Sequence, residues 1–257
     1  MALDSLLEIL QDPRTRQPLC EPVRYVFGIP TFLKEGDVVG QNAKYQKMYD
    51  NIGRFTGSVF WFICRLFRLD MVSKRKELLS ELVIRSKDKV LETSIGAGAN
   101  IAALPLDAEY VGVDISIEML RACQKYSLLK PYHLQLVHAN AEKLPFRDES
   151  FDVVFHFGGI NFFNDIPGAI REMIRVAKPG AQILIGDETQ IHVESWYSKL
   201  PFVKKYFCDT PPVLPPMDAI PSQIKDAKLS YKWAGTMYVI TFTKSTLLSD
   251  RGGGGTC

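Results

Sequence analysis

The sequence predicts an α/β fold with a mostly parallel sheet and helices on both faces. Five short β-rich runs alternate with helical segments at 99–104, 116–126 and 165–177. The runs are Lys89–Thr93, Tyr110–Asp114, Leu134–His138, Phe151–His156 and Gln182–Asp187. Such alternation is typical of parallel strands joined by crossover helices. Lys178-Pro179-Gly180 is a typical end for the last of these helices.

Composition and charge indicate a globular protein. The chain has 257 residues, 46% of them hydrophobic and 23% charged, with a net charge of +2. These values exclude a wholly disordered chain and give no global reason to expect nucleic-acid binding. The apolar run Phe55–Cys64 is shorter than the ~20 residues of a membrane-spanning helix. Met1–Leu10 lacks a signal-peptide pattern, so we expect a soluble, cytoplasmic protein.

The cysteines are dispersed along the chain and odd in number. They are Cys20, Cys64, Cys123, Cys208 and Cys257. No two of them have metal-ligand spacing, so we expect neither a disulfide framework nor a metal site.

Segments of different amino-acid composition flank the region of alternating strands and helices. Residues 1–40 are turn-rich, with a helix expected near Asp4 and two short strands near Val23–Phe27 and Thr31–Leu33. Residues 41–88 predict a helical cover, with helices at Phe55–Leu69 and Lys74–Leu82; its basic residues leave peripheral membrane contact open. Residues 191–227 predict an aromatic, proline-rich lid over the substrate. Residues 228–244 predict an antiparallel hairpin with strands Lys228–Ala234 and Met237–Thr243, and residues 251–257 a flexible tail.

Polar and small residues follow three neighbouring strands, at the edge where open parallel sheets bind ligands. Glu92 lies at the end of the first strand and is followed by Gly96 and Gly98, which allow a ligand to approach the backbone. Asp114 ends the second strand, where one carboxylate can accept hydrogen bonds from both ribose hydroxyls. Asn140 follows the third strand and offers a donor and an acceptor to an adenine edge. The three features in this order predict a nucleoside site.

The glycine spacing decides between nucleoside cofactors. The dinucleotide fingerprint needs a third glycine at the position of Ile101, and no Gly-Lys-Ser/Thr sequence of a P-loop occurs. S-adenosylmethionine is therefore the favoured cofactor.

At these residues the chain resembles the class I S-adenosylmethionine-dependent methyltransferases, in the ubiquinone/menaquinone C-methyltransferase (type 11) branch. The resemblance rests on VLETSIGAGAN, VGVDIS, HANAEKLPFRDESFDVVFHFG and DIPGAIREMIRVAKPGAQILI, which cover roughly 40% of the chain. It implies a Rossmann-like, seven-stranded sheet in a domain of residues 41–250, with the cofactor core at 89–190. The C-terminal hairpin would supply the antiparallel strand of that sheet.

The resemblance also implies roles for individual residues. It places Glu92, Gly96, Ala97 and Gly98 at the methionine end of the cofactor, Asp114 at the ribose, Ile115, Met119, Asn140 and Ala141 at the adenine, and His156 near the sulfonium. Ser94 is a departure, because the family pattern usually has glycine at this position.

Residues 1–40 carry a second resemblance, to small zinc-ribbon-like modules found beside some methyltransferases. It rests on LLEILQDPRTRQPL and GIPTFL. The usual Cys-x-x-Cys is replaced by Asp12 to Thr15, and Cys20 alone cannot build a four-ligand site. We therefore expect a metal-free extension, with an irregular arm as the alternative.

Acid–base and acceptor residues are expected around the methyl group. His156 and His192 are candidates for a general base, since histidine titrates near neutrality. An alternative for His156 is that it only shapes the pocket. Aromatic side chains suit a flat or apolar acceptor, and the candidates for this wall are Tyr49, Trp61, Trp196 and Tyr197.

The predicted function is methyl transfer to a small, apolar or aromatic metabolite. Two alternatives stay open: an RNA base methyltransferase, and a catalytically silent S-adenosylmethionine-binding protein that acts through partners. The sequence leaves open whether O, N, C or S is methylated and whether the protein is a monomer or a homodimer.

Overall fold

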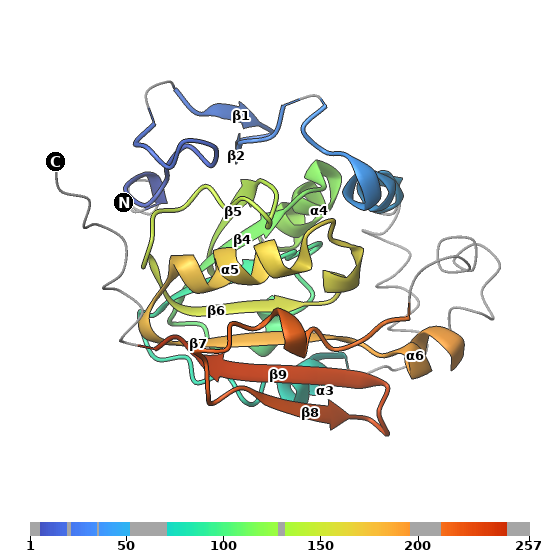
Figure 1. Cartoon of the computed structure of the whole chain (residues 1–257). Helices are drawn as coiled ribbons and strands as arrows, with labels where there is room; N and C mark the ends of the chain where they lie inside the picture. Colours follow the sequence, from blue (N-terminus) through green and yellow to red (C-terminus); the bar gives the residue numbers. More distant parts are fainter. Residues whose placement is uncertain are drawn as a thin grey trace, which may run out of the picture.

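The described strands form one twisted sheet. The computed structural model describes residues 6–19, 22–34, 36–51, 71–127, 132–195 and 212–245. The strands lie in the order β1-β2-β5-β4-β3-β6-β7-β9-β8 (Figure 1). Their bounds are β1 Arg24–Val26, β2 Ile29–Thr31, β3 Lys89–Thr93, β4 Glu109–Asp114, β5 His133–His138, β6 Phe151–Phe157, β7 Ala177–Glu188, β8 Lys228–Lys232 and β9 Met237–Thr243.

Strands β3 to β9 confirm the predicted seven-stranded sheet, and β1 and β2 extend it to nine strands. The central strands β5, β4, β3, β6 and β7 are mutually parallel. Strand β9 is antiparallel to β7, and β8 is antiparallel to β9. The carboxyl ends of the five parallel strands therefore meet at one edge.

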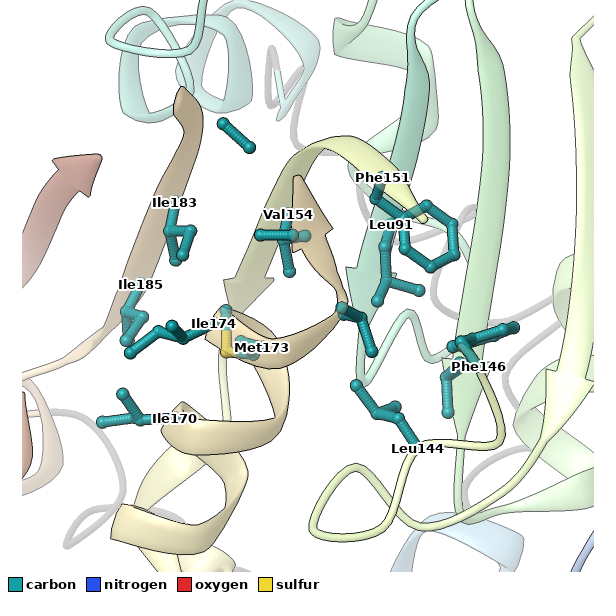
Figure 2. Close-up of a cluster of buried hydrophobic side chains, with 14 of the residues drawn as sticks. Leu91, Leu144, Phe146, Phe151, Val154, Ile170, Met173, Ile174, Ile183 and Ile185 are labelled. Atoms are coloured by element: carbon teal, nitrogen blue, oxygen red, sulfur yellow. The ribbon is translucent and has the colours of Figure 1, made fainter. Parts of the chain in front are cut away.

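Helix α5, Ile166–Val176, packs on one face of the sheet (Figure 1). Its side chains Ile170, Met173 and Ile174 face Val154 of β6 and Ile183 of β7 (Figure 2). The helix begins where Asp165 Oδ1 accepts a hydrogen bond from the Gly168 amide at 2.8 Å, which satisfies one unpaired donor of the first turn. It ends at Val176, before the Lys178-Pro179-Gly180 sequence, as predicted.

The opposite face is covered by α3, Met71–Leu78, and α4, Ile117–Ser127 (Figure 1). Buried residues of these helices, such as Leu78 and Leu120, pack with Val90 and Phe155 of the sheet. Val90 and its neighbour Leu91 face opposite cores, because successive strand side chains alternate between faces.

The N-terminal extension joins the sheet edge beside β5. Strand β2 runs parallel to β5 with Thr31 opposite His138, and the Phe32 amide donates to the His138 carbonyl at 2.9 Å. Leu10 is 1% exposed and forms an isolated bridge with Phe146. The extension is therefore an integral part of the sheet and of its core.

Several predicted boundaries shift. The helix expected at 99–104 is only the 3-10 turn η1, Ile101–Ala103. The helix expected at Lys74–Leu82 is α3, and the strand expected at Thr31–Leu33 begins two residues earlier. In the hairpin, β8 ends at Lys232 because the turn takes in Trp233 and Ala234, both with positive φ. Asp4, Phe55–Leu69 and the tail at 251–257 lie outside the described residues.

Candidate functional site

The loop after β3 combines three residues in the left-handed region of backbone space. The φ angles are 61° for Ser94, 56° for Gly96 and 79° for Gly98. A Cβ on Gly98 would lie 2.6 Å from Cys123 Sγ of α4, so this close approach requires glycine. Ser94 adopts the angle that glycine adopts without strain, at a cost of about 1 kcal/mol.

Asp114, at the end of β4, holds this loop. Its Oδ2 accepts from the Gly96 amide and its Oδ1 from the Ser116 amide, each at 2.8 Å. Burial and the nearby Asp50 carboxylate together raise the pKa of Asp114 to about 6, while the two amide hydrogen bonds oppose the shift. Asp50 in turn accepts from Ser116 Oγ at 2.5 Å. A carboxylate has more acceptor positions than these two amides use, so Asp114 can still accept hydroxyl donors.

Glu92, near the end of β3, is 2% exposed. Its Oε1 accepts from Asn100 Nδ2 at 2.5 Å, whereas its buried Oε2 has no hydrogen-bond partner within the described residues. Burial raises the pKa of Glu92 to about 8, and Asn100 and Arg75 oppose this shift. A buried carboxylate oxygen without a donor is costly unless a ligand supplies one.

The end of β5 contributes a third wall. His138 Nε2 lies 3.1 Å from the Ile115 carbonyl, and the Asn140 Oδ1 accepts from the Glu142 amide at 2.9 Å. Asn140 thus organises its own turn, an Asx arrangement. A cavity of about 30 Å³ remains between the three strand ends; its lining is Asn42, Ser94, Val113, Asp114, Ile115, Ala139, Asn140, Ala141 and Phe163.

A helical segment at 40–51 lies across this cavity. Tyr45 is 4% exposed and stacks on Phe162 with ring centroids 3.9 Å apart. Gln46 Nε2 donates to the Ile115 carbonyl at 2.8 Å, and Asn42 Nδ2 donates to Glu142 Oε1 at 2.8 Å. The segment therefore covers the residues predicted to bind the cofactor.

His156, near the end of β6, is fully buried. Its Nδ1 lies 3.1 Å from Thr93 Oγ1, and its ring meets Phe163 edge-on. Burial lowers the pKa of His156 to about 4, so the ring is neutral at physiological pH. These surroundings favour the pocket-shaping alternative over a general base.

Asp187, at the end of β7, anchors the loop that follows β6. It accepts hydrogen bonds from the amides of Gly159 and Ile160 and from Asn161 Nδ2, each at 3.0 Å. Burial and the adjacent Glu188 raise the pKa of Asp187 to about 6. Its oxygens are engaged by this loop, so Asp187 shapes the wall beside the cofactor residues.

His192 and Glu188 stand at the same edge. His192 lies on α6, Gln190–Ser195, with its Nε2 3.4 Å from Glu188 Oε1. Burial lowers the pKa of His192, and Asp187 opposes the shift. Tyr49 of the covering segment is close enough to Asp187 and Glu188 that both raise its pKa, in addition to burial. An aromatic hydroxyl and an imidazole–carboxylate pair thus lie at the same edge of the sheet.

Sequence reasoning missed part of the site. Asn100 and Gln46 contact the predicted cofactor residues Glu92 and Ile115 directly. Arg75 contacts Asn100, and Asp50 contacts Ser116 beside Asp114. None of these four, Arg75, Asn100, Gln46 and Asp50, was predicted to belong to the site. Asn100 has a local signal, since it directly follows the glycine loop; the other three come from helices whose docking no pattern predicts. Trp61, Trp196 and Tyr197 lie outside the described residues.

The described ranges contain no cluster of three or more His, Cys, Asp or Glu side chains that could hold a metal. No helix among them is long and apolar enough to cross a bilayer. A hollow of about 590 Å³, lined by charged residues such as Lys89, Arg147 and Lys178, lies at the opposite edge of the sheet.

Comparison with known families and relatives agrees with this geometry. Residues 91–185 match the model of a family described as a methyltransferase domain. Demethylmenaquinone methyltransferases from Lysinibacillus sphaericus and Listeria monocytogenes are 28% and 30% identical, over 51% and 49% of this chain. A phthiotriol/phenolphthiotriol dimycocerosates methyltransferase from Mycobacterium leprae is 33% identical over 40% of the chain. The chain spans 58%, 55% and 38% of the length of these relatives.

Solved structures share the fold. An S-adenosylmethionine-dependent methyltransferase from Thermotoga maritima superposes with a TM-score of 0.55 at 20% identity, over 77% of this chain and 100% of that one. A second, from Methanococcus maripaludis, has a TM-score of 0.55 at 18% identity, over 83% and 97% of the two chains. Residues 91–185 are therefore similar to a methyltransferase domain, and the chain shares its fold with these two S-adenosylmethionine-dependent methyltransferases.

Proposed function

We propose that this protein transfers a methyl group from S-adenosylmethionine to a small, apolar or aromatic acceptor. The observation that carries the proposal is the pairing of Asp114 with the Gly96 amide beside the buried Glu92, at the carboxyl edge of the sheet. This edge is where open α/β sheets bind nucleotides.

The residues fit the cofactor chemically. The unpaired Oε2 of Glu92 would accept from the ammonium group of the methionine portion. Asp114 would accept from the ribose hydroxyls, with Gly96, Ala97 and Gly98 along the backbone of the cofactor. Ile115, Met119, Asn140 and Ala141 would surround the adenine, and of these Ile115, Asn140 and Ala141 line the cavity.

When bound, this cofactor supplies a methyl group on a positively charged sulfur for in-line transfer to a nucleophile. The protein orients both partners and excludes water. We assign the general base to His192, with Glu188 orienting its ring, because both side chains are partly exposed at the edge where the acceptor would bind. His156 is assigned a supporting role, since its ring is fully buried.

The acceptor class is supported by aromatic side chains and by the relatives. Tyr45, Tyr49, Phe162 and Phe163 lie around the carboxyl edge and suit a flat or apolar acceptor. The relatives named above methylate, by their names, demethylmenaquinone and phthiotriol or phenolphthiotriol dimycocerosates.

Cofactor binding requires the segment at 40–51 to move. The cavity beneath it is about 30 Å³, whereas small-molecule pockets usually measure about 300 to 1,000 Å³. The hydrogen bond from Gln46 and the stacking of Tyr45 would re-form around the bound cofactor and complete the exclusion of water.

Calorimetry and labelled methyl transfer test the proposal. The full chain should bind S-adenosylmethionine, and Asp114→Asn should weaken binding at least about tenfold by removing a charge-assisted acceptor. Asp107→Asn, in the exposed loop before β4, is the matched control and should bind normally. Incubation of cell extract with methyl-labelled cofactor, read by mass spectrometry, would then identify the acceptor.

Two outcomes would overturn the proposal. Absence of cofactor binding by the unmodified chain would refute the cofactor assignment. Binding without transfer to any small molecule would favour the catalytically silent alternative.

A further inference from the structure

A chain of polar contacts runs from helix α3 to the cofactor-binding edge. Arg75 Nη1 donates to Asn100 Oδ1 at 2.9 Å, and Asn100 Nδ2 donates to Glu92 Oε1 at 2.5 Å. Asn100 and Glu92 are 3% and 2% exposed, so water is excluded from the link between them. Neither Arg75 nor Asn100 belongs to the cofactor residues that the resemblance implied.

Arg75 fixes which way the Asn100 amide faces. A guanidinium group only donates, so the oxygen of the amide must turn toward it. The amide nitrogen then points at Glu92 and can only donate to it, which suits an ionised carboxylate. With Oε1 engaged, the remaining Oε2 is the oxygen left for a ligand.

The position of Arg75 is itself determined by neighbouring contacts. Its guanidinium lies 5.2 Å from the centre of the Phe157 ring. Two residues along the same helix, Glu77 Oε2 accepts from Trp233 Nε1 of the hairpin turn at 3.0 Å. These contacts hold α3 against the sheet and keep the guanidinium beside Asn100.

Among the described residues, charged or titratable groups of α3, β4 and α4 surround Glu92. Arg75 of α3 favours its ionised form, whereas Asp114 of β4 opposes it. Cys123 of α4 stays protonated, because burial and the nearby Glu92 and Asp114 raise the pKa of its thiol. Arg75 is therefore a cation, within the described residues, that partly offsets the cost of burying the ionised form of Glu92.

We propose that Arg75 is a positioning residue that acts through Asn100 to favour the ionised form of Glu92 and to aim its Oε2 at the ammonium group of the cofactor. This inference rests on the proposed function and assigns it a further residue. Helix α3 thereby sets affinity for the amino acid portion of the cofactor and leaves the nucleoside portion unaffected.

Two ligands separate this role from a merely structural one. S-adenosylhomocysteine carries the amino acid portion, and 5′-methylthioadenosine lacks it. Dissociation constants for both would be measured by calorimetry on the full chain, on Arg75→Met and on Arg75→Lys. Lys76→Met is the matched control, because Lys76 is exposed on the same helix.

At neutral pH, Arg75→Met should weaken S-adenosylhomocysteine binding about tenfold, the effect of one pKa unit on Glu92. Binding of 5′-methylthioadenosine should change less than about twofold, within measurement scatter. Arg75→Lys keeps the charge and should recover part of the loss. Asn100→Ser, which cannot span both partners, should reproduce the loss with Arg75 intact.

The pH profile gives a second readout. Affinity for S-adenosylhomocysteine should rise as the pH approaches the raised pKa of Glu92, about 8, because ionised Glu92 binds the ammonium group. Arg75→Met should shift that rise to higher pH, since a supporting positive charge is gone.

An equal loss for both ligands in Arg75→Met, or no loss for either, would overturn the inference while leaving the cofactor assignment intact. Failure of the unmodified chain to bind either ligand would instead refute the proposed function, and the inference with it.

Discussion

The two halves of the carboxyl edge are built in different ways. In the cofactor half, at β3, β4 and β5, Asp114 contacts backbone amides of the adjoining loops, such as those of Gly96 and Ser116. In the acceptor half, at β6 and β7, Asp187 likewise anchors the loop that follows β6, but the candidate base His192 lies on the separate helix α6. Tyr49, which faces this half, comes from a segment more than 100 residues away in sequence.

Local sequence can therefore encode one part of such a site but not the other. Glycines, a strand-end acid and a following helix specify the cofactor half by themselves, because parallel strands bring their carboxyl ends together. The acceptor half depends on how helices pack over the edge, and different packing would select a different acceptor on the same sheet.

Substitution of His192 should have the largest effect, and that effect should be confined to catalysis in the acceptor half. His192→Gln should lower kcat by at least about 100-fold, because the proposed general base is lost, while the dissociation constant of S-adenosylmethionine stays unchanged. Steady-state kinetics and calorimetry would measure the two quantities. His133→Gln, exposed on β5, is the control and should leave both unchanged.

Unchanged kcat in His192→Gln would show that the acceptor needs no base at this position. A parallel loss of cofactor affinity would show instead that the two halves are not independent.

The N-terminal extension should unfold together with the cofactor half in one transition. Leu10 is 1% exposed and packs in the same core as Leu91 of β3. Leu10→Ala should lower the free energy of unfolding by about 2 to 5 kcal/mol, measured by urea titration in a single transition. Leu7→Ala, 40% exposed, should cost far less. Two separate transitions would contradict a shared core.

Removing the charge of Glu92 should raise the free energy of unfolding while weakening cofactor binding. Glu92 has an ordinary pKa near 4.3 when unfolded and about 8 when folded, so the folded state holds an extra proton between these values. The stability that this extra proton contributes to the folded state is therefore lost as the pH rises through this window. Glu92→Gln should gain at least about 1 kcal/mol over the unmodified chain at pH 8 and bind cofactor more weakly. The same difference in unfolding free energy between Glu92→Gln and the unmodified chain at acidic and at alkaline pH would contradict this.

The sequence was sufficient for the sheet but only for one half of the site. The five parallel strands, helix α5 and the hairpin all form near their predicted positions, because each has its own periodicity and turn residues. Asp114 and Glu92 stand at the predicted strand ends for the same reason.

What the sequence could not predict depends on tertiary packing. Serine itself does not indicate the left-handed backbone of Ser94, although the glycine usual at this position in the family pattern does. Arg75 reaches Asn100 only because α3 is held by Glu77 and Trp233. Helix α3, MVSKRKEL, has few apolar residues, so the sequence pattern alone does not predict which face of the helix is buried.

The smallest expected effect concerns the segment that joins the two halves. Gln46 anchors the helix at 40–51 to the Ile115 carbonyl, a hydrogen bond worth about 1 kcal/mol. Gln46→Ala should speed both cofactor binding and release about fivefold, because the segment must open for each, and should leave the dissociation constant nearly unchanged. Stopped-flow fluorescence would measure the rates, with Gln41→Ala, exposed on the same helix, as the control. Unaltered rates would mean that the cofactor reaches Asp114 by a route that leaves this segment in place.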